Sequence, residues 1–117
     1  DAVSLINTLT GMKVDIQRKA FVLANKTGGV SGPAIHPIAV RMVYEAANAV
    51  NVPIIGMGGI ATAEDAIEML LVGASAVSVG TANFYNPAVT MEIVDGIEQY
   101  MEAQGFASVA DMVGIVK

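Results

Sequence analysis

The chain has 117 residues, no cysteine and a formal net charge of −5. This length fits a single domain, and the missing cysteine excludes disulfides, thiolate metal ligands and a cysteine nucleophile within the chain. The acidic balance argues against a nucleic-acid surface, and the sequence has neither an apolar run long enough for a membrane span nor a basic, signal-like start. We therefore expect a cytoplasmic protein that binds neither nucleic acid nor membrane.

Hydrophobic residues make up 54% of the chain and charged residues only 15%, whereas globular domains average about 25% charged residues. A small domain has a large surface for its volume, so a monomer this apolar would expose sticky patches. Two explanations are open: the chain is part of a larger fold, or it buries an apolar face in a homo-oligomer.

The first predicted element is a short buried-type strand over residues 3–6, which Asn7 and Thr8 end. A long connection over residues 9–33 follows, and connections of this length usually have a function. Within it, residues 12–16 and 20–24 can pair as a hairpin. Residues 25–33 are rich in glycine and proline and are predicted to form a loop.

After this connection, helices alternate with strands. Pro33 suits the first turn of a helix, and Thr62 is a natural N-cap with acidic residues in the turn after it. Gly73 is suited to the position after the second helix, and Ser108 can cap a short last helix. The predicted helices and strands, in chain order, cover residues 34–50, 52–55, 63–71, 76–79 and 86–103.

The order strand, loop, helix, strand, helix, strand, helix predicts an α/β fold with a parallel sheet. Three strands make a poor complete sheet, and a closed (β/α)₈ barrel needs about 250 residues. We therefore expect residues 1–117 to form the C-terminal three βα units of a TIM barrel, as an incomplete barrel.

Ligands of parallel α/β folds lie at the carboxyl ends of the strands. The predicted strand ends carry small or hydrogen-bonding residues but no acid, base or metal ligand, which favours binding over proton transfer. Gly58-Gly59 precedes a helix start, and Gly80-Thr81 follows the next strand. Backbone N–H groups at such turns bind phosphate, so these two turns predict a phosphate site. The alternative is that the glycines only make tight turns.

Four other residues near the predicted strand ends and the glycine-rich loop carry hydrogen-bonding or basic side chains. Asn7 and Thr8 can hydrogen-bond the edge of a polar planar ligand, or Asn7 can close an Asx-type turn. Lys26 precedes the glycine-rich loop and can meet an anion or remain solvated. His36, the only histidine, is expected to be a surface or capping group and not a catalyst.

Four motifs in order resemble the dihydroorotate dehydrogenase family, and best its class 1B catalytic subunits. They are INTLTGM, NKTGGVSGPAIHP, IIGMGGI and SVGTANF, at residues 6–12, 25–37, 54–60 and 78–84. The resemblance implies a (β/α)₈ barrel that binds FMN and oxidises dihydroorotate to orotate in pyrimidine biosynthesis. It also implies electron transfer from FMN to a partner subunit with FAD and an iron–sulfur cluster, and from there to NAD.

The resemblance also implies roles for individual residues. Asn7 and Thr8 would bind the pyrimidine. The FMN contacts would be Ile6 and Gly32 at the flavin, and Gly58, Gly59, Gly80 and Thr81 at its phosphate. His36 stands where relatives often have lysine, and we expect no change in chemistry from this difference.

The cysteine that acts as base in class 1 enzymes, and a lysine that supports the flavin, lie earlier in the barrel and are absent here. The resemblance therefore implies that the isolated chain lacks dehydrogenase activity. Three alternatives stay open: a pyrimidine-reducing flavin domain like that of dihydropyrimidine dehydrogenase, a non-catalytic phosphate-binding half-barrel, and a barrel isomerase or aldolase with a phosphorylated substrate.

Overall fold

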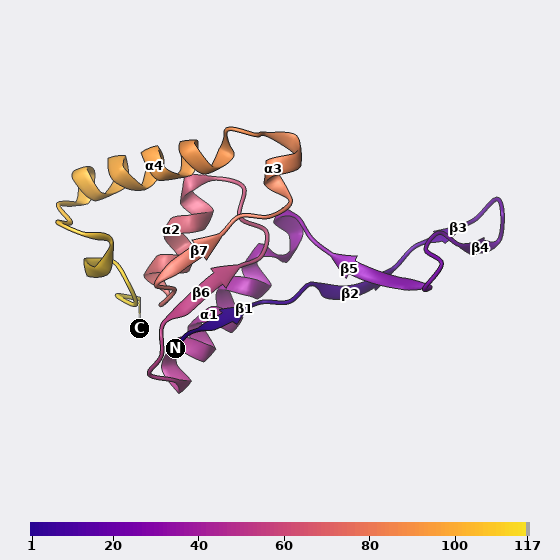
Figure 1. The fold of residues 1–117 in the computed structure, drawn as a ribbon, viewed down its shortest axis with the longest axis horizontal. Helices are drawn as coiled ribbons and strands as arrows, with labels where there is room; N and C mark the ends of the chain where they lie inside the picture. Colours follow the sequence, from indigo (N-terminus) through magenta and orange to yellow (C-terminus); the bar gives the residue numbers. More distant parts are fainter. Residues whose placement is uncertain (117) are drawn as a thin grey trace.

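The computed structural model describes residues 1–116. Figure 1 shows a body of helices and parallel strands, from which a long antiparallel β-ribbon, residues 9–30 and called the ribbon below, extends. The central sheet has the strand order β1-β6-β7, with all pairs parallel. Its strands are Val3–Leu5, Ile54–Met57 and Ala76–Ser78. The predicted parallel α/β arrangement is therefore confirmed.

Helices follow each of these strands in the chain. Helix α1 (His36–Ala49) is preceded by the short 3₁₀ turn η1 (Pro33–Ile35), and α2 (Ala63–Leu71) separates β6 from β7. After β7 come α3 (Ala82–Tyr85), α4 (Val89–Gln104) and the 3₁₀ turn η2 (Val109–Asp111). Among residues 1–116, no helix is both long and apolar enough to cross a membrane.

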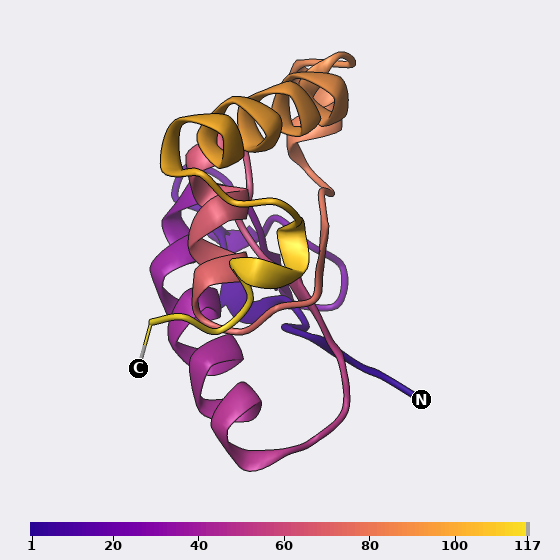
Figure 2. The same ribbon diagram turned by 90° about the vertical axis from the view of Figure 1, so that its left-hand side faces the viewer.

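The helices cover one face of the sheet, as Figure 2 shows with α1 and α2 to one side of the strands. Strand residues alternate between faces, and residues paired in register share a face. Ile54 and Gly56 of β6 are buried toward the helices, whereas Ile55 and Met57 are only half-buried. Within the described residues, the face that carries Ile55 and Met57 has no helix layer over it.

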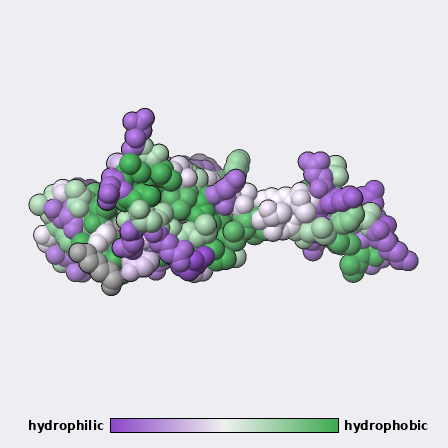
Figure 3. Space-filling view, turned by 90° about the horizontal axis from the view of Figure 1, so that it is seen from below, coloured by the Kyte–Doolittle hydropathy of each residue, from purple (hydrophilic) through white to green (hydrophobic). Residues whose placement is uncertain are grey.

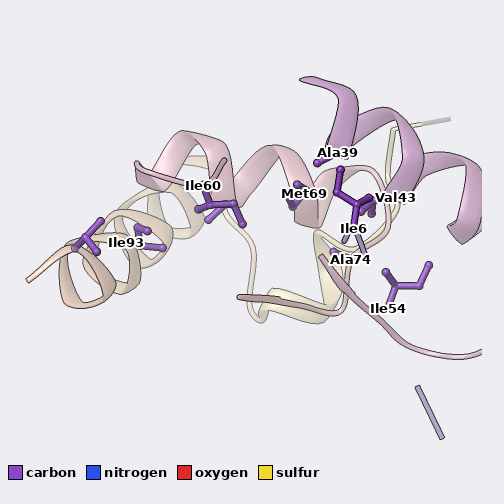
Figure 4. Close-up of a cluster of buried hydrophobic side chains, with 10 residues drawn as sticks. Ile6, Ala39, Val43, Ile54, Ile60, Met69, Ala74 and Ile93 are labelled. Carbon is purple, nitrogen blue, oxygen red and sulfur yellow. The ribbon is translucent and has the colours of Figure 1, made fainter. Parts of the chain in front are cut away.

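The main core fills the space between the sheet and the helices (Figure 4). Ile54, Val43 and Met69 are almost fully buried there, and each such side chain contributes about 1.5–3 kcal/mol through its removal from water. Gly56 permits the close packing, because a Cβ at this position would lie 3.1 Å from the Cβ of Ala74 and 3.2 Å from the sulfur of Met69. A second cluster packs α2 against α4 and η2.

The residues at the two ends of α2 predict its boundaries correctly. Thr62 is its N-cap, and its hydroxyl accepts a hydrogen bond from the Asp65 amide at 3.3 Å. The Asp65 carboxylate in turn accepts from the amides of Ala61 and Thr62, both at 2.9 Å. Gly73 has a φ of 123° and follows Val72, the C-cap of α2, as its place in the sequence predicts.

The ribbon consists of two short antiparallel pairs. The inner pair is β2 (Leu9–Met12) with β5 (Thr27–Val30), and the outer pair is β3 (Val14–Asp15) with β4 (Ala20–Phe21). The outer pair confirms the predicted hairpin over a shorter extent. In Figure 3 the ribbon is narrow and pale near its base, with apolar residues exposed at its far end.

The prediction of a loop over residues 25–33 was wrong for residues 27–30. Glycine is normally unfavourable in strands, but here it permits close approach. A Cβ at Gly28 would lie 2.6 Å from the side chain of Leu23, and one at Gly11 would lie 2.5 Å from that of Val30. The glycines therefore form a thin strand pair that local composition alone does not reveal.

Two further boundaries differ from the sequence expectation. The central strand covers residues 54–57 and not 52–55, because Pro53 has no N–H for the ladder, although its carbonyl accepts from the Val3 amide at 2.9 Å. The predicted third helix begins at Val89 and not at Asn86, and α3 precedes it without having been predicted. Asn86 lies between the two helices, where its side-chain oxygen accepts from the Ala88 amide at 3.0 Å.

Candidate functional site

A pocket of about 380 Å³ opens at the carboxyl ends of the three parallel strands, which is the edge where α/β folds bind ligands. Segments far apart in the chain contribute to it: the end of β1, the connection before α1, and the turns after β6 and β7. Its lining includes six residues predicted as contacts from the resemblance to a known family, namely Ile6, Gly32, Gly58, Gly59, Gly80 and Thr81. Thr8 lines it as well.

The turn after β6 depends on its two glycines. Gly58 has a φ of 132° and Gly59 a φ of 70°, values that side chains rarely permit. A Cβ at Gly59 would lie 2.8 Å from both the Gly32 carbonyl oxygen and the His36 amide nitrogen. The turn is therefore packed directly against the start of α1, and glycine is required there for steric reasons.

The turn after β7 is more open. No heavy atom would lie within 4 Å of a Cβ added at Gly80. Asn83 holds the backbone of this turn, since its side-chain amide donates to the carbonyls of Val79 at 2.9 Å and Gly80 at 3.1 Å. The Thr81 hydroxyl donates to the Ser31 hydroxyl at 2.9 Å, which joins this turn to the glycine-rich connection.

Within residues 1–116, the amides of Gly58, Gly59, Gly80 and Thr81 donate no hydrogen bond to another residue. Four unpaired N–H groups around one pocket are a suitable donor set for phosphate oxygens, which accept only. None of the lining residues is charged, so an anion would be held by N–H and hydroxyl groups. The residues present therefore fit the phosphate of a nucleotide-like cofactor.

The prediction from the sequence places the phosphate at the glycine turn that precedes α2. The amides of Ala61 and Thr62, at the start of this helix, are paired because both donate to the Asp65 carboxylate. The unpaired donors lie one turn earlier, at the two glycines.

Asn7 is exposed and lies outside the pocket lining, and its side-chain oxygen accepts from the Thr8 amide at 2.8 Å. This local bond resembles the turn-closing alternative that the sequence left open. Its neighbour Ile6 is buried, with 6% of its surface exposed, and lies in the pocket wall.

The structure corrects the expectation for one basic residue and decides between the open alternatives for another. His36 is not on the surface: only 6% of it is exposed, because its ring lies between the turn after β6 and the side of α2. Lys26 lies on the ribbon, with its ammonium 5.7 Å from the ring centre of Phe21, and is not part of the pocket lining. It therefore does not contact an anion in the pocket.

Sequence reasoning missed several residues of the pocket. Three of them are polar, namely Ser31, Ser78 and Asn86, and for Ser31 the position inside the glycine-rich motif was the available signal. The others are mostly apolar residues with no chemical signature, among them Met57, Ile60, Tyr85 and Val89. In the described part of the chain, no three His, Asp or Glu side chains gather as a metal site would require.

A family model described as dihydroorotate dehydrogenase matches residues 1–101. The chain belongs to the dihydroorotate dehydrogenase family. Dihydroorotate dehydrogenase B (NAD(+)), catalytic subunit, from Lachnoclostridium phytofermentans is 62% identical over 117 residues, which is all of this chain and 39% of that protein. The protein of the same name from Bacteroides fragilis is 52% identical over the same length and again is covered to 39%.

The chain thus spans about two fifths of the length of these family members. A solved structure of the family, dihydroorotate dehydrogenase from Eimeria tenella in complex with ferulenol, superimposes with a TM-score of 0.79 at 28% identity. That match covers 98% of this chain and 31% of the other. The resemblance inferred from the four sequence motifs is confirmed by these matches.

Proposed function

We propose that this chain supplies the cofactor-phosphate site and part of the pyrimidine site of an FMN-dependent oxidoreductase that converts dihydroorotate to orotate. The observation that carries the proposal is the pair of glycine turns with four unpaired amides around one uncharged pocket. Membership of the dihydroorotate dehydrogenase family supports FMN as the ligand. When bound, the flavin accepts a hydride from the substrate.

The residues of the chain divide between two tasks in this proposal. Gly58, Gly59, Gly80 and Thr81 bind the phosphate of FMN, while Ile6 and Gly32 line the flavin. Thr8 and Asn7 bind the pyrimidine above it. The polar groups are therefore concentrated at the phosphate, and the apolar wall faces the ring system, as ligand pockets commonly arrange them.

The proton that leaves the substrate needs a base, and no acidic or basic side chain lines the pocket. We propose that this chain forms the last three βα units of a (β/α)₈ barrel. The base then belongs to a part of the family fold that lies outside this chain. The chain alone then binds ligands without turnover. This same observation favours, as a second candidate, a phosphate-binding module without catalysis.

A flavin titration tests the phosphate site. FMN and riboflavin differ by the phosphate alone, so quenching of flavin fluorescence should report affinity at least 10-fold higher for FMN, with inorganic phosphate as a competitor. Equal affinity for the two flavins would show that the glycine turns do not bind phosphate. Adding orotate or uracil to the FMN-loaded chain then distinguishes two substrate specificities. A dihydroorotate-oxidising site requires orotate to bind, whereas a uracil-type pyrimidine site requires uracil to bind.

The relatives are named catalytic subunits of an NAD(+) enzyme. We propose that electrons leave the flavin for a partner subunit with FAD and an iron–sulfur cluster, and then reach NAD in the cytoplasm. Co-expression with such a subunit should yield a complex that copurifies. Separate elution of the two chains would contradict this assembly for the present chain.

We also propose that the chain associates with itself. Within the described residues, β1 and β7 each pair on one side only, and the face with Ile55 and Met57 has no layer over it. Unpaired strand edges and uncovered apolar faces promote association. Light scattering should give a mass above 12.0 kDa that rises with concentration, and a constant monomer mass would contradict the proposal.

A further inference from the structure

His36 is the one polar or charged residue among residues 1–116 that is buried, and the proposed function gives it no role. It is the first residue of α1, yet its ring contacts two other elements. Nδ1 lies 2.9 Å from the carbonyl oxygen of Gly58, and Nε2 lies 3.1 Å from a carboxylate oxygen of Glu68 on α2. Asp65, also on α2, is 3.8 Å from Nε2.

Both near partners of this ring are hydrogen-bond acceptors. A carbonyl oxygen and an ionised carboxylate cannot donate, and a neutral imidazole has only one N–H. Both contacts are therefore hydrogen bonds at once only when the ring carries two protons and a positive charge. Such a buried cation requires paired acceptors on both sides, and Gly58 with Glu68 supplies them.

The contact with Gly58 bears on the phosphate site through the peptide that Gly58 shares with Gly59. In a trans peptide the carbonyl and the following N–H point to opposite sides. A carbonyl held by His36 therefore fixes the direction of the Gly59 N–H, one of the four unpaired donors of the pocket. The close packing of Gly59 on the His36 backbone adds a second constraint on the same peptide.

We propose that His36 is a positioning residue of the phosphate site, whose ring holds the Gly58 carbonyl and joins this turn to Glu68 of α2. We call the two contacts of the ring, with Gly58 and with Glu68, the His36 bridge. Its consequence for ligand binding rests on the proposed function, whereas the bridge itself does not. The carboxylates of Glu68 and Asp65 are the charged groups that face the ring. Glu68 is 61% exposed, so solvent weakens its share of the attraction.

Amide substitutions divide the bridge into its two halves. An asparagine amide nitrogen occupies approximately the place of Nδ1, and a glutamine amide nitrogen approximately that of Nε2. His36→Asn therefore keeps a donor for Gly58 and loses the bond to Glu68, while His36→Gln does the reverse. Glu68→Gln leaves the ring in place and removes the facing charge.

The ligand-free readout is the Gly59 amide resonance in ¹H–¹⁵N spectra at one fixed pH. It should move in His36→Gln, which loses the donor for the Gly58 carbonyl, and stay close to the wild-type position in His36→Asn, which keeps that donor. The FMN readout is the affinity of each variant divided by that of the wild-type chain.

We expect His36→Gln to weaken FMN binding by about 10-fold, and His36→Asn by less than about 3-fold, because only the second variant keeps a donor for the Gly58 carbonyl. Urea unfolding of each variant identifies any that is only destabilised.

The proposal is overturned if the Gly59 amide resonance of His36→Gln coincides with that of the wild type and this variant binds FMN like the wild type. It is also overturned if His36→Gln and His36→Asn lose affinity by the same factor, as they would at a merely structural residue. If the wild-type chain binds no FMN but the Gly59 resonance still moves in His36→Gln and not in His36→Asn, the bridge is supported and the proposed function is the part that fails.

Discussion

The turn after β6 and the turn after β7 line the same pocket, yet the molecule supports them in different ways. Gly59 is packed against the backbone of Gly32 and His36, and the carbonyl of Gly58 is bonded to the His36 ring. Around Gly80 there is open space. The first turn is held by packing against the start of α1 and the connection before it, whereas the second is held mainly by the Asn83 side chain and a hydroxyl pair.

This difference separates two reasons for a glycine that look alike in a sequence. At Gly59 the missing side chain is needed for the fold, because the backbone conformation and the neighbours both exclude a Cβ. At Gly80 it is needed only if a ligand approaches the backbone closely. Stability and ligand affinity should therefore respond differently to substitution at the two turns.

The largest effect is expected for Gly59→Ala. The positive φ costs about 1–2 kcal/mol and the forced displacement of Gly32 and His36 about 1–3 kcal/mol more, which gives about 2–5 kcal/mol in total. Urea denaturation followed by circular dichroism measures this loss. Gly105→Ala is the matched control, since Gly105 has a φ of 75° but no heavy atom within 4 Å of an added Cβ.

In this control we expect only the backbone cost, about 1–2 kcal/mol. Equal losses for Gly59→Ala and Gly105→Ala would show that the packing of the first turn on α1 adds nothing to its stability.

A smaller effect is expected at the N-cap of α2, which follows the first turn. Thr62→Ala removes the side-chain bond to the Asp65 amide, and such caps contribute about 1 kcal/mol. Thr62→Ser keeps the hydroxyl and should stay close to the wild type. A Thr62→Ala variant with unchanged unfolding free energy would mean that the cap is not needed to anchor this side of the turn.

The hydroxyl pair of the second turn comes next. Thr81→Val keeps the shape of the side chain and loses its bond to Ser31, for a cost of about 0.5–1.5 kcal/mol. Ser31→Ala should cost a similar amount, and the double variant should cost less than the sum, because both lose the same bond. Strictly additive losses in a double-mutant cycle would contradict a direct contribution of this bond.

The smallest effect on stability is expected for Gly80→Ala, within about 0.5 kcal/mol, because the new methyl group meets nothing. FMN affinity should nevertheless fall several-fold, since the methyl group enters the space that the phosphate needs. Riboflavin binding serves as the control and should change little. Undiminished FMN affinity in a stable Gly80→Ala chain would remove this turn from the phosphate site.

The sequence predicted those parts of the molecule whose signals are local. Thr62, Asp65 and Gly73 define both ends of α2, and the order of the strands defines the sheet and the edge where ligands bind. The composition of residues 27–30 predicts a loop because glycine is a poor strand former, and only the pairing with β2 explains the strand. The burial of His36 depends equally on distant segments, namely Gly58 and Glu68, which no local pattern brings to its ring.

The most direct test of the account is a residue-resolved titration of the amide resonances with FMN, repeated with riboflavin and with inorganic phosphate. The two-turn phosphate site predicts that FMN and phosphate shift the amides of Gly58, Gly59, Gly80 and Thr81 most, and that riboflavin leaves these four nearly unchanged. Shifts that gather on the ribbon or on α4, or that are the same for FMN and riboflavin, would contradict it.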